Sequence, residues 1–277
     1  MGCATRNPTS LERTGVAAYR RGHYREAADE LETARRVLDE RGNHGLDYAR
    51  VLQDLAEVYR VLGRSADAEP LVREALAIRE RLLPAGDPEI GRTLSNLGLV
   101  LTARHKYGDA EDACRRAIAN LEAALGPQHV DVATPLGNLA AVLVHLRRCA
   151  EAEAVGRRSL AIREHNLPPT HPDVGRGLSA VAGAIGCDPA RYAEAEQYHA
   201  RAVKSFEMGL GEDHPQVALA LGGWARDAAA AGRLEAAEEL CARSVRIERI
   251  RLPPGSSETE AVRRCLSEAR PRASVAQ

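Results

Sequence analysis

Apolar side chains recur along this chain at helical spacing, in pairs of segments separated by short polar turns. Between residues 52 and 62 they fall on one stripe of a helix, and between residues 68 and 78 they form a second stripe. The two stripes consist of Leu52, Leu55, Ala56, Val58, Tyr59 and Leu62, and of Ala68, Leu71, Val72, Ala75, Leu76 and Ile78. The pattern therefore predicts two antiparallel helices joined by a tight turn.

The paired pattern returns at a nearly constant interval. Each copy closes on a leucine, and these leucines are Leu83, Leu125, Leu167, Leu210 and Leu252, with steps of 42, 42, 43 and 42 residues. One additional residue near 187–190 accounts for the longer step. A degenerate first copy at 15–42 brings the number of helix pairs to six. A fixed period of this length is typical of solenoid proteins, in which each pair packs on its neighbours.

Small residues and glycines recur at fixed places within each copy. Alanine or glycine stands where the two helices of a pair must approach closely, at Ala56, Gly98, Ala140, Ala182 and Ala225 in the first helix and at Ala68, Ala110, Ala152, Ala195 and Ala237 in the second. The turn between the helices is predicted to carry Gly63, Gly108 or Gly232, since glycine is a common helix stop.

This arrangement resembles the tetratricopeptide repeat, whose pattern has a large residue, Leu-Gly, an aromatic residue and then an alanine in the second helix. The 42-residue period and linkers such as "HPDV" at 171–174 are similar to the kinesin light chain and nephrocystin type. The resemblance implies an all-α, right-handed superhelical solenoid over residues 9–255, followed by a C-terminal capping helix at 256–270. The expected repeats are 9–44, 45–86, 87–128, 129–170, 171–213 and 214–255, with disordered tails at 1–8 and 271–277.

Two nearly identical phrases, "NLPPTHPDV" at 166–174 and "GLGEDHPQV" at 209–217, place a histidine close to an acidic residue. A metal or catalytic role is one interpretation. However, each histidine stands just before the first helix of a repeat, where proline is favoured at the first helical position and a polar side chain can accept from free N–H groups. Because His129, His171 and His214 are one repeat apart, they cannot converge on one metal ion. We interpret them as helix caps and expect no metal site.

Composition narrows the classes of partner. The 277 residues include 38 basic and 39 acidic side chains, for a formal net charge of −1. This balance provides no broad attraction to nucleic acid or to an anionic membrane. No window approaches the roughly 18 apolar residues that a membrane span needs. We expect a protein or peptide partner and no nucleic acid, and the sequence leaves the oligomeric state open.

The cysteines are scattered and include no CxxC pair: Cys3, Cys114, Cys149, Cys187, Cys241 and Cys265. We expect them to be reduced, mostly packed thiols, and leave open only a pairing of Cys149 with Cys187, which lie near turns of neighbouring repeats. The chain lacks GxSxG, a phosphate loop, HExxH and GxGxxG, so we predict no enzyme and no cofactor. The alternative is an unusual site around His145, Cys149 and Cys187.

Two further features are expected to be structural. Trp224 is the only tryptophan, and it aligns with the core position that Leu55 and Leu97 occupy in earlier copies, so we predict that it packs in the core. Glu151 and Glu153 belong to a repeated "EAE" pattern and are interpreted as part of a solvated helix face.

The family resemblance also implies where a partner binds. The first helices of successive pairs line the concave wall, and an asparagine just before the core Leu-Gly or Leu-Ala hydrogen-bonds the peptide backbone in family members. Asn96 and Asn138 match that position, whereas Asp54, Ala180 and Gly223 replace it in the other copies.

One helical turn earlier, three of four copies carry an arginine, which favours an acidic peptide or a C-terminal carboxylate as the ligand. The predicted peptide-binding residues are Arg50, Asp54, Arg92, Asn96, Asn138, His145 and Arg176, with Thr134 in the fourth copy. The competing interpretation is that the arginines are solvated or paired within the chain, for example Arg50 with Asp54.

The sequence thus predicts a protein-interaction scaffold or adaptor that binds a partner segment in the concave groove, in the cytoplasm. The alternative is an assembly or tethering subunit that contacts partners by its convex face or its ends. The first residues, "MGCATRNPTS", resemble the mature start of bacterial lipoproteins, and Cys3 would then be a membrane anchor if the true start lies upstream. No hydrophobic segment precedes Cys3 in the chain as given.

Overall fold

The computed structural model describes residues 7–251, and within this range the chain is all-α, as predicted. The elements are α1 (Pro8–Arg20), α2 (Tyr24–Glu40), α3 (Leu46–Val61), α4 (Ser65–Leu82), α5 (Pro88–Ala103), α6 (Tyr107–Leu125), α7 (Val130–His145), α8 (Cys149–Asn166), α9 (Pro172–Ile185), a short 3-10 helix η1 (Pro189–Arg191), α10 (Tyr192–Leu210), α11 (Pro215–Ala230) and α12 (Leu234–Arg251). The predicted capping helix at 256–270, the tail at 271–277 and residues 1–6 lie outside the described residues.

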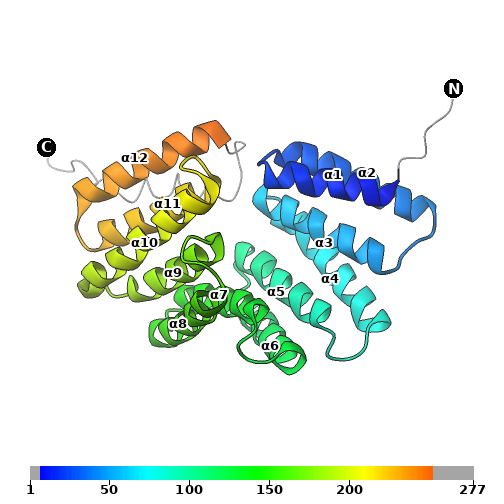
Figure 1. The fold of residues 1–277 in the computed structure, drawn as a ribbon, viewed down its shortest axis with the longest axis horizontal. Coiled ribbons are helices and arrows are strands. Elements are labelled where there is room, and N and C mark those ends of the chain that lie inside the picture. Colours follow the sequence, from blue (N-terminus) through cyan, green and yellow to red (C-terminus); the bar gives the residue numbers. More distant parts are fainter. Residues whose placement is uncertain (1–6, 252–277) are drawn as a thin grey trace, which may run out of the picture. The chain divides into compact units, whose positions relative to one another are not determined.

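The helices fall into two compact units, Met1–Pro127 and Gln128–Gln277 (Figure 1). Unit 1 contains α1 to α6 and unit 2 contains α7 to α12. Within each unit, every helix packs on its pair partner and on the next helix along the chain. The first helices of successive pairs also contact one another, α1 with α3 and α3 with α5, and α7 with α9 and α9 with α11. We call the side formed by these first helices the inner face of each unit, and the side formed by the second helices its outer face.

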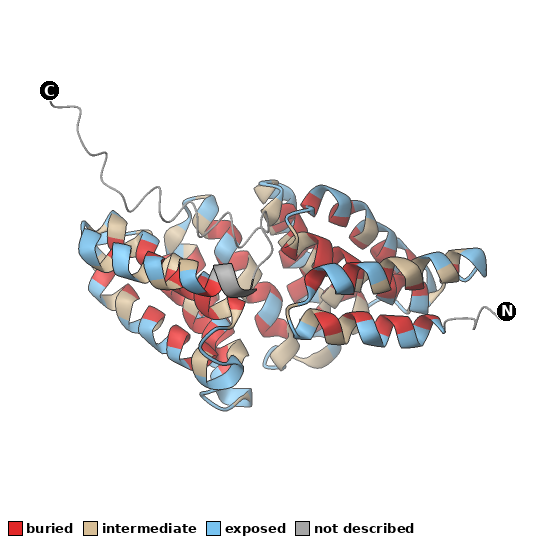
Figure 2. Ribbon diagram, turned by 90° about the horizontal axis from the view of Figure 1, so that it is seen from above, coloured by how far each residue is buried: buried red, intermediate tan, exposed pale blue. Residues whose placement is uncertain are grey.

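Small residues permit the close contact within each pair. The predicted alanines are completely buried, and the buried sides of the helices turn toward their neighbours (Figure 2). At Gly98 on α5, an added Cβ would lie 2.6 Å from Cys114 Sγ on α6. Real Cβ atoms do not come that close, so α5 and α6 could not keep this distance with a larger residue at 98. The prediction of close approach at these positions is confirmed.

The turns between paired helices correct one prediction. Gly63 and Gly232 adopt left-handed backbone angles, with φ of 77° and 76°. Gly108, however, lies inside α6, one residue after its start. The left-handed position of that turn is taken by His105, and Arg147 takes it in the next pair, with φ of 59° and 60°. The left-handed position is therefore present in these turns although the residue that occupies it differs, and the connection from α9 to α10 lacks it.

The histidines cap helices, as predicted. The Nδ1 atoms of His129, His171 and His214 accept hydrogen bonds from the backbone N–H two residues later, at 3.2, 3.1 and 3.2 Å. Asp87 performs the same role for α5 through its carboxylate, at 2.8 Å. Each side chain satisfies an N–H group that the first helical turn leaves without a partner.

The one cysteine pairing that the sequence leaves open is formed. Cys149, the first residue of α8, forms a disulfide with Cys187, which follows α9, and their Cα atoms are 6.0 Å apart. Packing of neighbouring repeats brings the two cysteines together. Cys114 is a free, buried thiol, and burial raises its pKa to about 12.

Trp224 on α11 is only partly buried, although it packs against the core as predicted. Its Nε1 donates to Tyr192 Oη at 3.2 Å, and its ring stacks on the imidazole of His199 with centroids 6.2 Å apart. His199 is buried and contacts Asp227 through Nε2 at 2.8 Å. The single tryptophan therefore closes a polar cluster between α10 and α11.

Candidate functional site

On the inner face of unit 1, Arg50 is held by two acidic side chains. Its Nη2 donates to Glu12 Oε2 on α1 at 3.1 Å and to Asp47 Oδ1, one turn earlier on α3, at 2.9 Å. Its Nε also donates to Glu12. Arg50 is thus paired within the chain, as the competing interpretation expects, although its partners are Glu12 and Asp47 and not Asp54.

Asp54, one turn further along α3, has an unusual proton affinity. Burial raises its pKa to about 7, and the charge of nearby Glu12 adds to this effect, whereas Arg50 and Arg79 oppose it. A carboxyl group that loses solvent binds its proton more tightly, because the charged form is the one that water stabilises. Asp54 therefore changes charge near neutral pH on the predicted binding wall.

The other two predicted residues of unit 1 lie on α5. Arg92 forms an ion pair with Glu89, one turn earlier. Asn96 is partly exposed, and its amide makes no hydrogen bond within residues 7–251. An unoccupied amide can donate and accept at once, which is the property that backbone capture requires.

The remaining predicted residues belong to unit 2. Arg176 on α9 is half exposed and pairs with Asp173, one turn earlier. Asn138 on α7 is partly buried, and His145 is the exposed last residue of the same helix. Seven residues separate Asn138 from His145, so they share one side of α7. The predicted set is thus divided into Arg50, Asp54, Arg92 and Asn96 in unit 1 and Asn138, His145 and Arg176 in unit 2.

Buried arginines beneath the inner faces are the feature that the sequence analysis missed. Arg79 on α4 is 4% exposed and reaches between α3 and α5. Its Nη1 donates to the side-chain oxygens of Gln53 and Thr93, the latter at 2.5 Å, and its Nη2 lies 3.4 Å from Glu89 Oε2. Burial lowers the pKa of Arg79.

Arg163 on α8 holds the same repeat position in unit 2 and is also 4% exposed. Its Nη1 donates to Ser159 Oγ at 3.0 Å, and it has no ion pair within residues 7–251. Burial lowers its pKa to about 10, with the nearby Asp173 raising it and Arg176 lowering it further. The repeated phrase "AIRE", at 77–80 and 161–164, is the sequence pattern from which both arginines could have been found.

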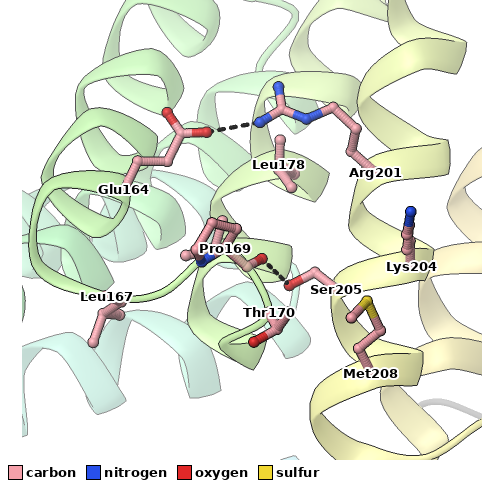
Figure 3. Close-up of a pocket in the computed structure, with 10 residues that line it drawn as sticks. Glu164, Leu167, Pro169, Thr170, Leu178, Arg201, Lys204, Ser205 and Met208 are labelled. Atoms are coloured by element: carbon pink, nitrogen blue, oxygen red, sulfur yellow. Dashed lines mark hydrogen bonds and ion pairs between the residues drawn. The ribbon is translucent and has the colours of Figure 1, made fainter.

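The outer face of unit 2 contains a pocket of about 490 Å³ between α8 and α10 (Figure 3). Its apolar lining includes Leu178 from α9 and Met208 from α10, and Met208 is 61% exposed. Arg201 bonds to Glu164 across one end at 2.8 Å. Lys204 also lines the pocket, and it has no ion-pair partner in the described part of the chain. The pocket combines exposed apolar surface with one uncompensated positive charge.

Glu153, which the sequence predicts on a solvated face, is part of an ion network on the same outer face. It accepts from Arg157 at 2.7 Å and from Arg191 at 2.7 Å. These hydrogen bonds, from Arg191 first and then from Arg157, lower the pKa of Glu153 to about 2. The network connects α8 with the start of α10, so this carboxylate contributes to packing between repeats.

No group of three or more metal-ligating side chains comes together between residues 7 and 251. The disulfide also engages both sulfurs of the alternative site around His145, Cys149 and Cys187, so neither is a free thiolate. None of the helices described is both long and apolar enough to cross a membrane.

Comparison with known families supports the repeat pattern. A sequence model of the tetratricopeptide repeat matches residues 8–81 and 89–165, and a second model of the same description matches residues 190–216. Among curated proteins, none matches the chain in sequence at a significant level.

Several solved structures share the fold. BtubC (BKLC) from P. vanneervenii is 23% identical, with a TM-score of 0.57 over 87% of this chain and 91% of that one. The nearly identical TPR-like repeats of a kinesin light chain from Podosopora anserina are 21% identical, with a TM-score of 0.53 over 72% of this chain and 94% of that one. The Rap protein complexed with Competence and Sporulation Factor is 16% identical, with a TM-score of 0.65 over 93% of this chain and 73% of that one. At these identities the likeness concerns the fold.

Proposed function

The chain belongs to the tetratricopeptide repeat family, and we propose on this basis that it is a protein-interaction scaffold that binds an acidic segment of a partner along the inner faces of its units. The fold supports the general part of this function, because helix-pair repeats present long surfaces for protein partners. The solved Rap structure, a complex with Competence and Sporulation Factor, is one relative in fold that holds a separate factor.

The observation that favours an acidic ligand is that Arg92 and Asn96 lie one turn apart on α5. The Asn96 amide is free among the described residues and can hydrogen-bond a peptide backbone. Arg92, one turn earlier, forms an ion pair with Glu89 on its own helix, and both side chains are about 40% exposed. Exposed pairs of this kind contribute only about 0.2–1 kcal/mol, so a carboxylate of the ligand can replace Glu89 at little cost.

The proposal is tested with immobilised acidic peptides, half with a free C-terminus and half amidated. We expect Asn96→Ala/Asn138→Ala and Arg92→Glu/Arg176→Glu to lose about tenfold or more in affinity, the loss of one or two charged hydrogen bonds. The matched control is Arg36→Glu/Arg81→Glu, which makes the same charge change on second helices. Helical circular dichroism checks that each variant folds. Equal binding by all variants would reject the inner faces as the binding site.

A second candidate function, a tethering or assembly subunit that uses the outer face, is favoured by two observations. The pocket between α8 and α10 exposes Met208 beside an unpaired Lys204. The disulfide between Cys149 and Cys187 is of a kind that persists in oxidising compartments and is rare in the cytosol. The disulfide therefore favours an oxidising compartment, as in the lipoprotein alternative with Cys3 as the anchor, over the predicted cytoplasmic location. Cys3 itself lies outside the described residues.

The two candidates respond to different substitutions. Met208→Glu/Lys204→Glu changes only the outer face, so partner capture lost in this variant and retained in Arg92→Glu/Arg176→Glu would favour the tethering function. Acid-quenched thiol labelling in the native cell would show whether Cys149 and Cys187 are oxidised there, which decides between the two locations.

A further inference from the structure

Arg79 and Arg163 are equivalent residues in two helix pairs, exactly two repeats of 42 residues apart in the sequence. Each lies on the second helix of its pair and is 4% exposed. Each extends between two first helices toward the inner face of its own unit. The surroundings of the two guanidinium groups can therefore be compared residue by residue.

In unit 1, the chain satisfies its buried arginine. Gln53 from α3 and Thr93 from α5 accept hydrogen bonds from Nη1, and the carboxylate of Glu89 lies 3.4 Å from Nη2. Two polar side chains from the inner-face helices and one negative charge thus surround the guanidinium. A buried cation requires partners of this kind, because an unpaired charge in the interior is costly.

In unit 2, the same partners are missing. The positions that correspond to Gln53 and Thr93 are Gly137 on α7 and Gly177 on α9, so neither helix provides a side-chain acceptor. The hydrogen bond to Ser159 comes from the arginine's own helix, four residues earlier. Arg163 has no ion pair within residues 7–251. The guanidinium of Arg163 is thus buried, and unit 2 lacks the side chains that bond to its counterpart in unit 1.

Asp173 occupies the position that Glu89 has in unit 1, but it does not form an ion pair with Arg163. Its side chain is one methylene shorter than that of a glutamate. It is also engaged elsewhere, because Arg176 forms an ion pair with it and His171 Nδ1 lies 3.7 Å from its Oδ2. It therefore acts on Arg163 through its field, from beyond ion-pair distance.

One of the two missing side chains, that at Gly137, lies on the side of the proposed binding surface, whereas Gly177 is buried against Leu160. Gly137 is partly exposed on α7, and a Cβ built there would lie 3.4 Å from Arg163 Nη1. The guanidinium is therefore one atomic layer beneath the inner face. Asn138 and Arg176, both predicted to bind peptide, are the chain neighbours of the two glycines.

We infer that Arg163, beneath Gly137, forms a subsite for a glutamate side chain of the bound segment. This inference rests on the proposed function and specifies one residue of the ligand. A glutamate is isosteric with the glutamine that satisfies Arg79, and it adds the negative charge that Arg163 lacks. Its slender arm can reach past Gly137, where α7 carries no side chain. A C-terminal carboxylate is attached directly to the peptide backbone and would have to bring that backbone to the same depth.

The test uses the full chain and a set of N-acetylated, C-amidated peptides in which one glutamate is scanned along a neutral background. Matched peptides carry glutamine instead, or carry only a free C-terminus. For the wild type we expect one glutamate position whose exchange for glutamine weakens binding about tenfold to a hundredfold, the range for a hydrogen-bonded charge pair. In Arg163→Met the same exchange should have no effect, since the partner of that glutamate is gone.

A second variant keeps the arginine and fills the subsite. Gly137→Gln supplies from α7 the amide that Gln53 supplies from α3, so it should bind the glutamate peptide about as weakly as Arg163→Met while melting at a higher temperature than the wild type. The control is Gly108→Gln, the same change on the second helix α6, at a position where an added Cβ meets nothing within 4 Å. It should retain wild-type affinity.

The outcomes separate the two claims. If wild type discriminates glutamate from glutamine and Arg163→Met discriminates equally well, the inner face binds acidic segments but the subsite is wrong. If the free-C-terminus peptide is the one that depends on Arg163, the glutamate assignment is overturned. If wild type binds none of the peptides, the proposed function fails, and the subsite fails with it.

Discussion

At the scale of single residues, charge on the inner face of unit 1 depends on a carboxyl group that titrates near neutral pH. Asp54 lies between Glu12, which repels its negative charge, and the cations Arg50 and Arg79, which favour it. Burial dominates and raises its pKa to about 7. Any acidic ligand that approaches α3 therefore meets a surface that is more negative at pH 8 than at pH 6.

The raised pKa of Asp54 predicts a pH-dependent stability. Between its ordinary pKa of 3.8 and about 7, the folded chain binds more protons at Asp54 than the unfolded chain does. The free energy of unfolding should therefore fall as pH rises through this window. Asp54→Asn should remove this dependence and be more stable than wild type at pH 8 by on the order of 1–3 kcal/mol. Denaturant unfolding at several pH values measures both, and parallel pH profiles for the two proteins would contradict it.

At the scale of elements, the start and the end of each helix pair are defined by different means. Every described first helix except α3 begins with a side-chain cap, from Asn7, from Asp87 or from histidine at His129, His171 and His214. Within five of the six pairs the turn has one left-handed residue, which is glycine at Gly22, Gly63 and Gly232 and a larger residue at His105 and Arg147. The connection from α9 to α10 has no left-handed residue and contains η1 instead. Where the left-handed turn recurs, the residue that provides it varies.

Removing a cap should destabilise the helix that it begins. His171→Ala deletes the acceptor for the Asp173 N–H, at 3.1 Å, and should cost about 0.5–2 kcal/mol. His171→Asp should retain the cap, because Asp87 already provides one at the same place in an earlier repeat. Thermal unfolding of the two variants gives the comparison, and equal losses in both would show that the imidazole has a different role.

Glycine at a strained turn position should stabilise the fold. Arg147 adopts φ of 60°, where a side chain crowds the backbone, so Arg147→Gly is expected to raise the free energy of unfolding by about 0.5–1 kcal/mol. As the reverse test, Gly63→Ala, at φ of 77°, should lower it by a similar amount. Chemical denaturation measures both changes, and a loss of stability in Arg147→Gly would mean that its side chain is required.

At the scale of the whole molecule, the described chain consists of two compact units, and the disulfide between Cys149 and Cys187 lies within one of them. Cys149 and Cys187 both belong to unit 2, where they connect the turn before α8 to the turn after α9. In repeat proteins, stability is approximately a sum over repeats and their neighbouring contacts. A crosslink in unit 2 is therefore expected to stabilise its own repeats and to have little effect on unit 1.

This locality is a testable expectation. Cys149→Ala/Cys187→Ala should lower the free energy of unfolding of unit 2 by about 2–4 kcal/mol, because the unfolded chain regains the freedom of a loop of 38 residues. Hydrogen exchange should accelerate in α8, α9 and α10, while amides in α1 to α4 keep wild-type rates. Uniform acceleration throughout residues 7–251 would show that the units unfold as one.

The features that could be predicted from the sequence are those that depend on local spacing or on the repeat period. The helix pairs, the alanines at close contacts such as Ala56 and the histidine caps all follow from spacings within one repeat. The inner-face residues could be proposed for the same reason, since Arg92 and Asn96 are one turn apart. The prediction of Gly108 as a turn residue was wrong because His105, which is not a glycine, occupies the left-handed position of that turn.

The sequence by itself determined the repeat, the helices and their caps, because helical periodicity and helix-end hydrogen bonds are short-range properties of the chain. Only the tertiary structure decided the partners of the charged side chains. Arg79 bonds to Gln53, 26 residues away, and Cys149 bonds to Cys187, 38 residues away. Such pairs depend on how neighbouring repeats pack, which no local pattern specifies. The same packing shows that Arg163 has glycines at the two positions from which Gln53 and Thr93 bond to Arg79.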